Sequence, residues 1–444
     1  MKLLQHAALQ TQAFDLGIFA NVLWNTSRGR WFFDGIRGVN HLGDHFSPLL
    51  AVLAPAFRLW NDAGVLLVIQ SAALSAALPF AYLLGRRVTG RRDAGVLLAV
   101  WLAFLPFLHR VSRFDFHETA LGVPLILGAL AAWHGGRRRA FWVSVGALLL
   151  LREDYGFLLA GLGFSWVLGG DRKERRVGAF LAVGGILWSL TVIFILMPLF
   201  HSGGQPLGFS YGHLGSGPGE MILSLFRPRT LWNLTLGSGV RRETLAGIVL
   251  WTGGLVLLSL RYSPAWLAPV LLQFLSGRDG QIRLEAHYAA GMIPFLVYAA
   301  AFGLRAVLDH PWVSVHPRAV RAALIAIGTG TAVIGFFAVP PYFHPVPVDR
   351  KGAAAVLPSI PPEASVQASA NLVPHLCLRK TIWMSPDSRR TEWVVLDRTP
   401  VGFSPPLEVL EESARFAGRN AAYRVYSRGG IEIFRFPFQR EDKS

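Results

Sequence analysis

Apolar runs and short polar linkers alternate along residues 63–340. The runs cover 63–84, 94–108, 118–134, 140–151, 156–169, 177–199, 244–260, 265–275, 288–309 and 320–340. A helix needs about 20 apolar residues to cross a bilayer, so the longer runs fit spans and the shorter ones fit helices extended by their flanks. The pattern predicts an α-helical polytopic membrane protein with about ten spans.

Residues 1–62 contain no convincing span. Apolar residues recur at helical spacing on one side of residues 14–26, which predicts an amphipathic helix lying in the membrane interface. Residues 46–60 are apolar but too short to span, and two prolines interrupt them, as is typical of a short or re-entrant segment. We therefore interpret 1–62 as an N-terminal region of amphipathic and re-entrant helices that precedes a transmembrane bundle at 63–340.

The chain changes character after a group of prolines around residue 341. Stretches rich in β-branched and aromatic residues alternate with turn residues there, and Arg428-Gly429-Gly430 is typical of a hairpin turn. We expect strands at 364–370, 381–384 and 393–397, a helix at 407–417, and hairpin strands at 423–426 and 431–436. These elements predict a small α/β domain over 341–444.

Composition agrees with a membrane protein. Only 16% of the residues are charged and 52% are hydrophobic, with a mean hydropathy of +0.40, whereas soluble domains carry about 25% charged residues. The net charge of +16 is carried by short basic clusters between the apolar runs. That pattern sets membrane topology and argues against a nucleic-acid partner. The single cysteine, Cys377, excludes an internal disulfide.

The basic clusters fall in alternate linkers, which the positive-inside rule places in the cytoplasm. They contain Arg86 to Arg92, Arg137 to Arg139, Arg172 to Arg176, Arg261, and Arg305 to Arg321. Residues 1–62 and the C-terminal domain then lie outside the cell (inner, cytoplasmic) membrane that the chain crosses repeatedly. An outer N-terminal region ordinarily follows a first span, so we expect a preceding transmembrane helix to be missing from this chain. The alternative is that the N-terminal tail crosses the membrane without such a span.

Acids and histidines gather in the outward linkers, although only arginine and lysine set the orientation. These residues are Asp15, Asp34, His41, Asp44, His45, Asp115, His117, Glu118, Glu153, Asp154, Glu285 and His287. Histidines beside a carboxylate suit proton transfer or metal ligation, so we expect one outer cavity. If residues 115–118 are helical, Asp115 and Glu118 share a face. The alternative is structural: a polar loop around Asp44, and helix N-terminal capping at 115–118.

Arginines on the outer side oppose the topology bias. Arg113 and Arg152 stand beside the acids of their linkers, and a guanidinium binds phosphate oxygens with two parallel hydrogen bonds. An outer cavity that receives a lipid-linked phosphate would need such groups. The alternative for Arg152-Glu153-Asp154 is a simple outer turn.

Two motifs resemble a known family. They are Phe14-Asp15-Leu16-Gly17-Ile18-Phe19 with Leu23-Trp24-Asn25, and Asn40-His41-Leu42-Gly43-Asp44-His45-Phe46-Ser47-Pro48. Both resemble the bacterial and archaeal membrane proteins called domain of unknown function 2079. Further matches are Phe116-His117-Glu118, Arg152-Glu153-Asp154, His287-Tyr288, and Pro374-His375-Leu376 with Arg379. This resemblance implies an architecture more than an activity.

At greater distance the layout is similar to the C-type glycosyltransferase superfamily. That resemblance implies many spans, a first outer loop with an essential acid, a second acidic outer loop, and often a C-terminal extracytoplasmic domain. By it, Asp15 matches the first-loop acid and 115–118 the second acidic loop. Residues 45–48 resemble the His…Pro segment of the protein mannosyltransferase and aminoarabinose transferase branches. The superfamily uses polyprenyl-phosphate-linked sugars, so it implies a lipid-linked donor as partner within the bilayer.

The leading hypothesis is therefore transfer of a sugar from a polyprenyl-phosphate-linked donor to an acceptor at the outer membrane face. Asp15 or Asp44, with His45, would be catalytic, and a hard cation such as Mg²⁺ or Mn²⁺ could be held by Asp44, Asp115 and Glu118. Substrate-binding candidates are His41, Arg113, Asp115, His117, Glu118, Arg152, Glu153, Asp154, His287, His375 and Arg379. The alternatives are a transporter or lipid flippase, or a non-catalytic envelope scaffold.

Overall fold

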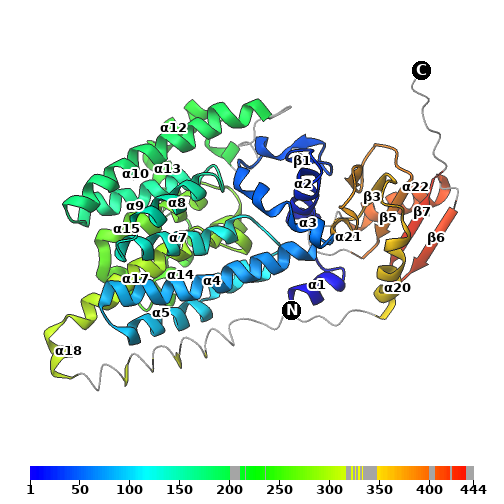
Figure 1. Ribbon diagram of the computed structural model, residues 1–444. Coiled ribbons are helices and arrows are strands. Elements are labelled where there is room, and N and C mark those ends of the chain that lie inside the picture. Colours follow the sequence, from blue (N-terminus) through cyan, green and yellow to red (C-terminus); the bar gives the residue numbers. More distant parts are fainter. Residues whose placement is uncertain are drawn as a thin grey trace.

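The computed structural model describes residues 1–200, 211–215, 217–235, 237–316, 348–399, 406–420 and 423–436, with isolated residues between 322 and 333. Figure 1 shows a helical bundle on one side, a smaller sheet-containing unit on the other, and the N-terminal region between them. One continuous hydrophobic core joins the three parts. The expected run at 320–340 lies largely outside the described residues.

The bundle is built from helices that follow the apolar runs. Its first half contains α4 Gly64–Thr89, α5 Arg92–Phe104, α6 Pro106–Arg113, α7 Thr119–His134, α8 Arg138–Leu149, α9 Tyr155–Gly169 and α10 Arg172–Thr191, continued by η4 Val192–Leu196 and η5 Met197–Phe200. The second half contains α12 Pro218–Leu225, α13 Pro228–Leu234, α14 Gly239–Trp251, η7 Leu255–Tyr262, α15 Ser263–Phe274, α16 Asp279–Ile282, η8 Ala286–Ala289, α17 Ile293–Leu308 and α18 Pro311–Val315. The expected run at 244–260 is divided between α14 and η7, because Gly253 and Gly254 adopt positive φ.

Three helices in the described part of the chain are long and apolar enough to cross a membrane: Gly64–Thr89, Arg172–Phe200 and Leu255–Phe274. Two bent helix pairs, which include α5 with α6 and α16 with α17, raise this number to as many as 5. The break between α5 and α6 falls at Pro106, which cannot donate a helical hydrogen bond. The count of about ten spans stays a prediction.

Close helix packing fixes the linker that carries Arg152. Helices α9 and α10 meet through Gly156 against Gly185 and Gly163 against Gly178, where an added Cβ would collide with the facing backbone. Small residues allow such close approach of membrane helices. Because α9 begins at Tyr155, this packing holds the preceding linker, residues 152–154, rigidly at one end of the bundle.

The N-terminal region folds into short elements. They are α1 Lys2–Ala7, η1 Ala13–Gly17, α2 Ile18–Thr26, the paired strands β1 Phe33–Asp34 and β2 Val39–Asn40, η2 His41–Gly43, η3 Pro48–Leu53 and α3 Ala56–Leu59. Every residue of α2 is buried, which differs from the expected interfacial helix. The reason is that Asn21 on its polar side donates hydrogen bonds to the carbonyls of Cys377 (2.6 Å) and Arg379 (3.0 Å). The C-terminal unit therefore covers the face that we expected to meet lipid headgroups.

The C-terminal unit contains a five-stranded sheet of order β4-β3-β5-β7-β6. The expected strands, helix and hairpin are confirmed as β3 Val366–Ala368, β4 Ile382–Met384, β5 Trp393–Asp397, α22 Leu407–Asn420, β6 Tyr423–Arg428 and β7 Ile431–Arg435, with α20 Val348–Val356 and α21 Val373–Leu376 beside them. Strand β3 is parallel to β4 and β5, and β7 is antiparallel to β5 and β6. Gly429 and Gly430 both have positive φ, as a two-residue hairpin turn requires.

Candidate active site

Five segments that are distant in sequence meet at one end of α7 and α9. Glu118 is the residue before α7, and Asp154 is the residue before α9. The residues that meet there are called the acid–histidine cluster below: Asp15, His45, His117, Glu118, Arg152, Glu153, Asp154 and His287. All of them come from segments predicted to face outward, so the structure brings together most of the predicted site residues.

Asp15 lies between two imidazole rings. Its Oδ2 is 3.9 Å from Nε2 of His117 and 3.7 Å from Nδ1 of His287. Burial, the Glu118 carboxylate and the more distant Asp115 carboxylate raise the pKa of Asp15 to about 7, although His45 and Arg152 oppose the shift. The Asp15 side chain is still 22% exposed. A partly accessible carboxylate with a pKa near neutrality is suited to general base catalysis.

Three carboxylates lie near the Nε edge of the Arg152 guanidinium. Its Nε lies 3.3 Å from Glu153, 3.4 Å from Asp154 and 3.7 Å from Glu118. The Arg152 side chain is 16% exposed, and its two terminal nitrogens donate no hydrogen bond to any residue that the structure describes. A guanidinium held along one edge presents its other donors to a ligand with oxygen acceptors.

His45 forms the second cationic group of the cluster. Its Nδ1 lies 3.1 Å from Oε1 of Glu153, and the same carboxylate accepts the backbone N–H of Phe46 at 3.0 Å. Burial opposes protonation of His45, but the Glu153 and Asp44 carboxylates outweigh burial and raise its pKa to about 9. The same pairing holds the pKa of Glu153 at about 2 against the effect of burial. His45 is therefore an imidazolium at neutral pH.

Asp44 forms an ion pair with Arg37, a residue that the sequence analysis did not identify as a site candidate. Arg37 donates to Oδ2 of Asp44 at 2.6 Å and to Oδ2 of Asp34 at 2.6 Å. Although burial opposes it, the positive charges of His45 and Arg37 hold the pKa of Asp44 well below its usual range. A signal for Arg37 was present in the sequence: it follows Asp34 by three residues and is a further arginine on the outward side.

His41 lies behind this pair as a buried, neutral ring. It is 1% exposed, its Nδ1 is 3.4 Å from Arg37, and its edge meets Phe19. Burial and the neighbouring His45 lower the pKa of His41 to about 3. His41 therefore supports the loop that carries His45 and lies one ring away from it, at a centroid distance of 5.9 Å.

Asp115 makes its contacts with the N-terminal segment rather than with the cluster residues. Its Oδ2 accepts the backbone N–H of Gln12 at 2.7 Å, and its Oδ1 lies 3.7 Å from Nζ of Lys2. Residues 114–118 are not helical, so the expectation that Asp115 and Glu118 share a helix face is wrong. The predicted Arg113 ends α6, and its backbone carbonyl accepts a hydrogen bond from Lys2.

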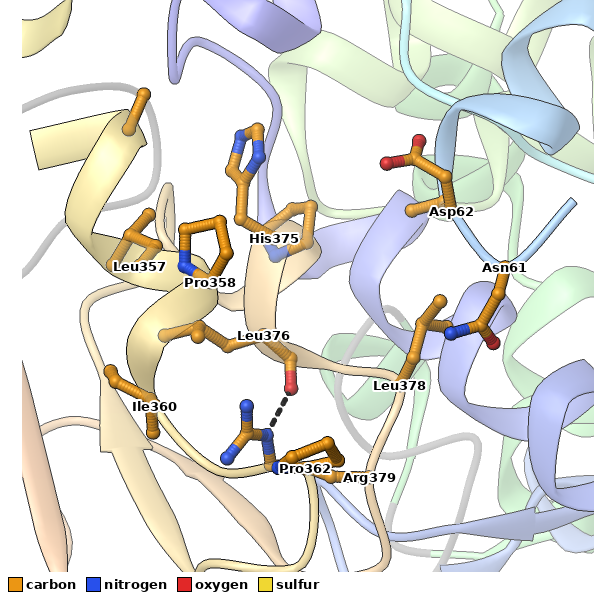
Figure 2. Close-up of a pocket in the computed structure, with 13 residues that line it drawn as sticks. Asn61, Asp62, Leu357, Pro358, Ile360, Pro362, His375, Leu376, Leu378 and Arg379 are labelled. Carbon is orange, nitrogen blue, oxygen red and sulfur yellow. Dashed lines mark hydrogen bonds between the residues drawn. The ribbon is translucent and has the colours of Figure 1, made fainter.

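His375 and Arg379 lie elsewhere, at the junction between the C-terminal unit and the N-terminal region. His375 stacks on His6 with a centroid distance of 4.1 Å, and both predicted residues line a cavity of about 290 Å³ that also contains Asp62 (Figure 2). Arg379 donates to the carbonyls of Leu376, Pro361 and Ala364. The structure does not bring these two residues to the cluster, and their role in substrate binding stays a prediction.

The predicted cation ligands do not converge. Asp44 is paired with Arg37, Asp115 with Lys2, and Glu118 with Arg152. In the described part of the chain, the side chains that could hold a metal together are Asp15, His117 and His287, whose donor atoms lie within 4.8 Å of one another. Two imidazoles and one carboxylate suit Mn²⁺ or Zn²⁺ better than Mg²⁺.

One observation agrees with such a site and one does not. Nδ1 of His287 is buried and lacks a hydrogen-bond partner among the described residues. Oε2 of Glu118 lies 2.9 Å from Nδ1 of His117, but both carboxylate oxygens of Glu118 lack a hydrogen-bond partner among the described residues. Nδ1 of His117 instead accepts the backbone N–H of Thr119 at 3.3 Å, which places the proton of a neutral ring on Nε2, toward Asp15, so that a metal would have to displace it. Thr119 also contacts that Nδ1, through its hydroxyl at 3.1 Å.

The chain matches the family described as "Predicted membrane protein (DUF2079)" over residues 5–429. Its structure is similar to that of ArnT from Cupriavidus metallidurans in the apo state, with a TM-score of 0.54, 13% identity, and coverage of 98% of this chain and 96% of that chain. At such low identity the similarity shows the fold alone. It agrees with the resemblance to C-type glycosyltransferases drawn from the sequence.

A second solved structure, the Archaeoglobus fulgidus oligosaccharyltransferase in the apo form, gives a TM-score of 0.48 and 17% identity over 84% of this chain. The chain spans 60% of the length of that protein. No curated protein matches the sequence.

Proposed function

Because this chain belongs to the predicted membrane protein family DUF2079, and because its fold is similar to that of ArnT, we propose that it is a membrane glycosyltransferase. It moves a sugar from a polyprenyl-phosphate-linked donor to an acceptor at the outer face of the membrane. The observation that carries this proposal is that one cluster holds both Arg152, whose two terminal nitrogens donate no hydrogen bond to any described residue, and Asp15, a carboxylate whose pKa is about 7.

The positive groups bind the donor phosphate. The terminal nitrogens of Arg152 donate to two phosphate oxygens, and the imidazolium of His45 adds a second positive charge beside it. These groups stabilise the negative charge that develops on the leaving phosphate oxygen, as fixed charges in a desolvated site do. The acids Glu118, Glu153 and Asp154 hold Arg152 in place through its Nε.

Asp15 is the general base. Its carboxylate takes the proton of the acceptor hydroxyl, the acceptor oxygen forms a bond to the anomeric carbon, and the bond from that carbon to the phosphate oxygen breaks. The polyprenyl phosphate leaves with the electron pair. Asp44, the other candidate base, is a weak one because Arg37 holds it ionised. Its task is to fix the loop that carries His45.

A metal ion would change the role of Asp15. If Mn²⁺ or Zn²⁺ bound to Asp15, His117 and His287, it would supply Lewis-acid charge for the phosphate, and the Asp15 carboxylate would no longer be free to take a proton. The two roles exclude each other, so metal dependence separates them. We propose the metal-free base, since an acid with a pKa near 7 is matched to that task.

The proposed reaction requires an orientation. The cluster and the C-terminal unit lie on the extracytoplasmic side of the inner (cytoplasmic) membrane, and about ten spans cross the bilayer. Support comes from the arginine-rich linkers, which join the opposite ends of the same helices. A reporter fused after Arg139 should read as cytoplasmic and one after Lys351 as extracytoplasmic.

The test uses the polyprenyl phosphate that the reaction releases, because this product is common to every sugar. The purified full chain should bind a polyprenyl phosphate more tightly than the matching polyprenol. Arg152→Lys keeps the charge but loses the paired donors and should weaken this binding about tenfold or more. Arg283→Gln, on an exposed arginine paired with Glu243, is the matched control and should bind normally.

If the folded wild type does not distinguish the phosphate from the alcohol, the transferase proposal is overturned. A transporter or lipid flippase would then be tested by vesicle flux. A scaffold would show neither activity.

A further inference from the structure

A second charged cavity lies at the other end of the bundle. It has a volume of about 250 Å³ and is lined by Arg87, His134, Arg261, Tyr262, Phe302 and Arg305, among others. His134 is the last residue of α7, a helix of 16 residues, so about 24 Å of helix separates this cavity from the acid–histidine cluster. Helix α4 likewise runs from the N-terminal region to the far end of the bundle, where it carries Arg87 (Figure 1).

The cavity has an apolar floor and a basic rim. Tyr262 and Phe302 are buried and stack at 4.0 Å. The Arg261 guanidinium lies 5.6 Å from the Phe302 ring, and both Arg261 and Arg305 are exposed. Two glycines make room for the arginines: a Cβ on Gly135 would collide with Arg87, and one on Gly169 with Arg261.

The acids that line the cavity do not neutralise this rim. Asp171 accepts the backbone N–H groups of Lys173 and Glu174, both at 2.8 Å, and so caps α10. Glu174 accepts the backbone N–H of Asp171 and the indole N–H of Trp133. Neither forms an ion pair with a lining arginine in the described chain, where Arg305 pairs only with the exposed Asp309.

The linkers at this end add further positive charge. They contain the basic residues Arg86, Arg91, Arg92, Arg137, Arg138, Arg139, Arg172, Lys173, Arg175 and Arg176 against the acids Asp93, Asp171, Glu174 and Asp309. The C-terminal ends of α4, α7 and α9 bring partial negative charge. Arg87 offsets part of this negative charge by donating a hydrogen bond to the Ala131 carbonyl near the end of α7.

We propose that this cavity binds a phosphate group at the inner membrane surface, with Arg261 and Arg305 as its principal ligands and Arg87 as the inner wall. Basic pockets between membrane helices bind the headgroups of anionic lipids. The apolar floor and the exposed rim fit a group that arrives from the bilayer surface. The same chemistry would accept a soluble phosphate, so the two sources are tested separately. Occupancy of the cavity does not depend on the proposed transfer reaction.

The experiment measures lipid binding to the delipidated full chain in detergent by native mass spectrometry. Phosphatidylglycerol should bind more tightly than phosphatidylcholine. Arg261→Gln and Arg305→Gln should each reduce this preference about fivefold, since one surface arginine contributes about that factor. Arg283→Gln removes the same charge from an exposed residue that pairs with Glu243 and does not line the cavity, and it should leave the preference unchanged.

Inorganic phosphate tests whether the cavity binds a soluble phosphate rather than a lipid headgroup. If it protects the wild type against heat, fails to protect Arg261→Gln, and competes with phosphatidylglycerol, the cavity binds phosphate from a soluble source. If phosphatidylglycerol binds but inorganic phosphate does not compete, the ligand is a lipid headgroup. Equal binding of the two lipids without any phosphate effect, or an equal loss in Arg283→Gln, would overturn the proposal.

Discussion

The rings of His117 and His287 stack with their centroids 3.6 Å apart and an interplanar angle of 12°. Two imidazolium ions could not share this arrangement without repulsion. Burial, Arg152 and His45 hold the pKa of His117 well below its usual range, so its ring is neutral. Asp15 faces this pair, and its carboxylate is the group of the three that gains and loses a proton near neutral pH.

Replacing Asp15 by asparagine should lower turnover about 10²–10⁴-fold, the usual loss when a general base is removed. Affinity for a polyprenyl phosphate should be retained, because the base touches the acceptor. Turnover of the wild type should rise as the pH increases through about 7, where Asp15 loses its proton.

Asp44→Asn is the matched control for this variant. It should cost less turnover, since Arg37 prevents Asp44 from acting as a base and the substitution only loosens the loop of His45. Single-turnover measurements on folded protein compare the two variants. An equal loss in both would contradict the assignment of the base.

Added Zn²⁺ should inhibit the enzyme, because Asp15, His117 and His287 can hold the ion and a bound carboxylate cannot take a proton. Mg²⁺ at the same concentration should have little effect, since it prefers oxygen ligands. His287→Ala should abolish the inhibition by Zn²⁺, and a chelator should leave the activity of the untreated protein intact. Loss of activity with a chelator, restored by Mn²⁺, would show instead that the three residues hold a required metal.

The His45–Glu153 pair should make thermal stability depend on pH. The pKa of His45 is raised from 6.5 to about 9, so its contribution is complete below pH 6.5 and is lost as the pH rises through 9. The pKa of Glu153 is lowered from 4.5 to about 2, so its contribution is complete above pH 4.5 and is lost as the pH falls toward 2. The pair therefore contributes most to the free energy of unfolding between pH 4.5 and pH 6.5.

His45→Gln should flatten the alkaline side of this profile, where the wild type loses about 3 kcal/mol by the size of the shift. Melting temperatures in detergent from pH 5 to pH 9.5 provide the measurement. A wild-type profile that stays flat up to pH 9.5 would show that the pair is not formed.

Asn21→Ala should destabilise the contact between the N-terminal region and the C-terminal unit. Asn21 donates to the carbonyls of Cys377 and Arg379 and accepts the backbone N–H of Gly35. Loss of buried hydrogen bonds costs about 1–3 kcal/mol. Limited proteolysis should cut the variant faster than the wild type within 341–365. Asn420→Ala, which removes an exposed hydrogen bond to the Phe416 carbonyl, should behave as the wild type.

The sequence predicted that acids and histidines of the outward linkers would meet in one cavity, and the structure brings Asp15, His45, Glu118, Arg152 and His287 together there. Alternate linkers of a helical bundle emerge at the same end, so the arginine pattern of one end fixed which residues could meet at the other. The strands of the C-terminal unit were also predictable, because β3 to β7 follow local alternation and a glycine turn.

Pairing within the site could not be predicted in the same way. Arg37 forms an ion pair with Asp44, and Lys2 forms one with Asp115. Both contacts depend on how short irregular segments fold over the bundle. The burial of α2 depends on carbonyls of Cys377 and Arg379, which belong to another part of the chain. No periodicity within residues 14–26 could reveal them.

The segment that carries Asp15 is also fastened to the C-terminal unit. The backbone N–H of Ala13 donates to Ala370, and the Asn371 side chain donates to Leu9. During synthesis the first of these segments leaves the ribosome long before the second exists. Asp15 therefore lacks this anchor until nearly the whole chain has been made. A chain halted before residue 370 would contain Asp15, the proposed base, without the contacts that hold its segment in place.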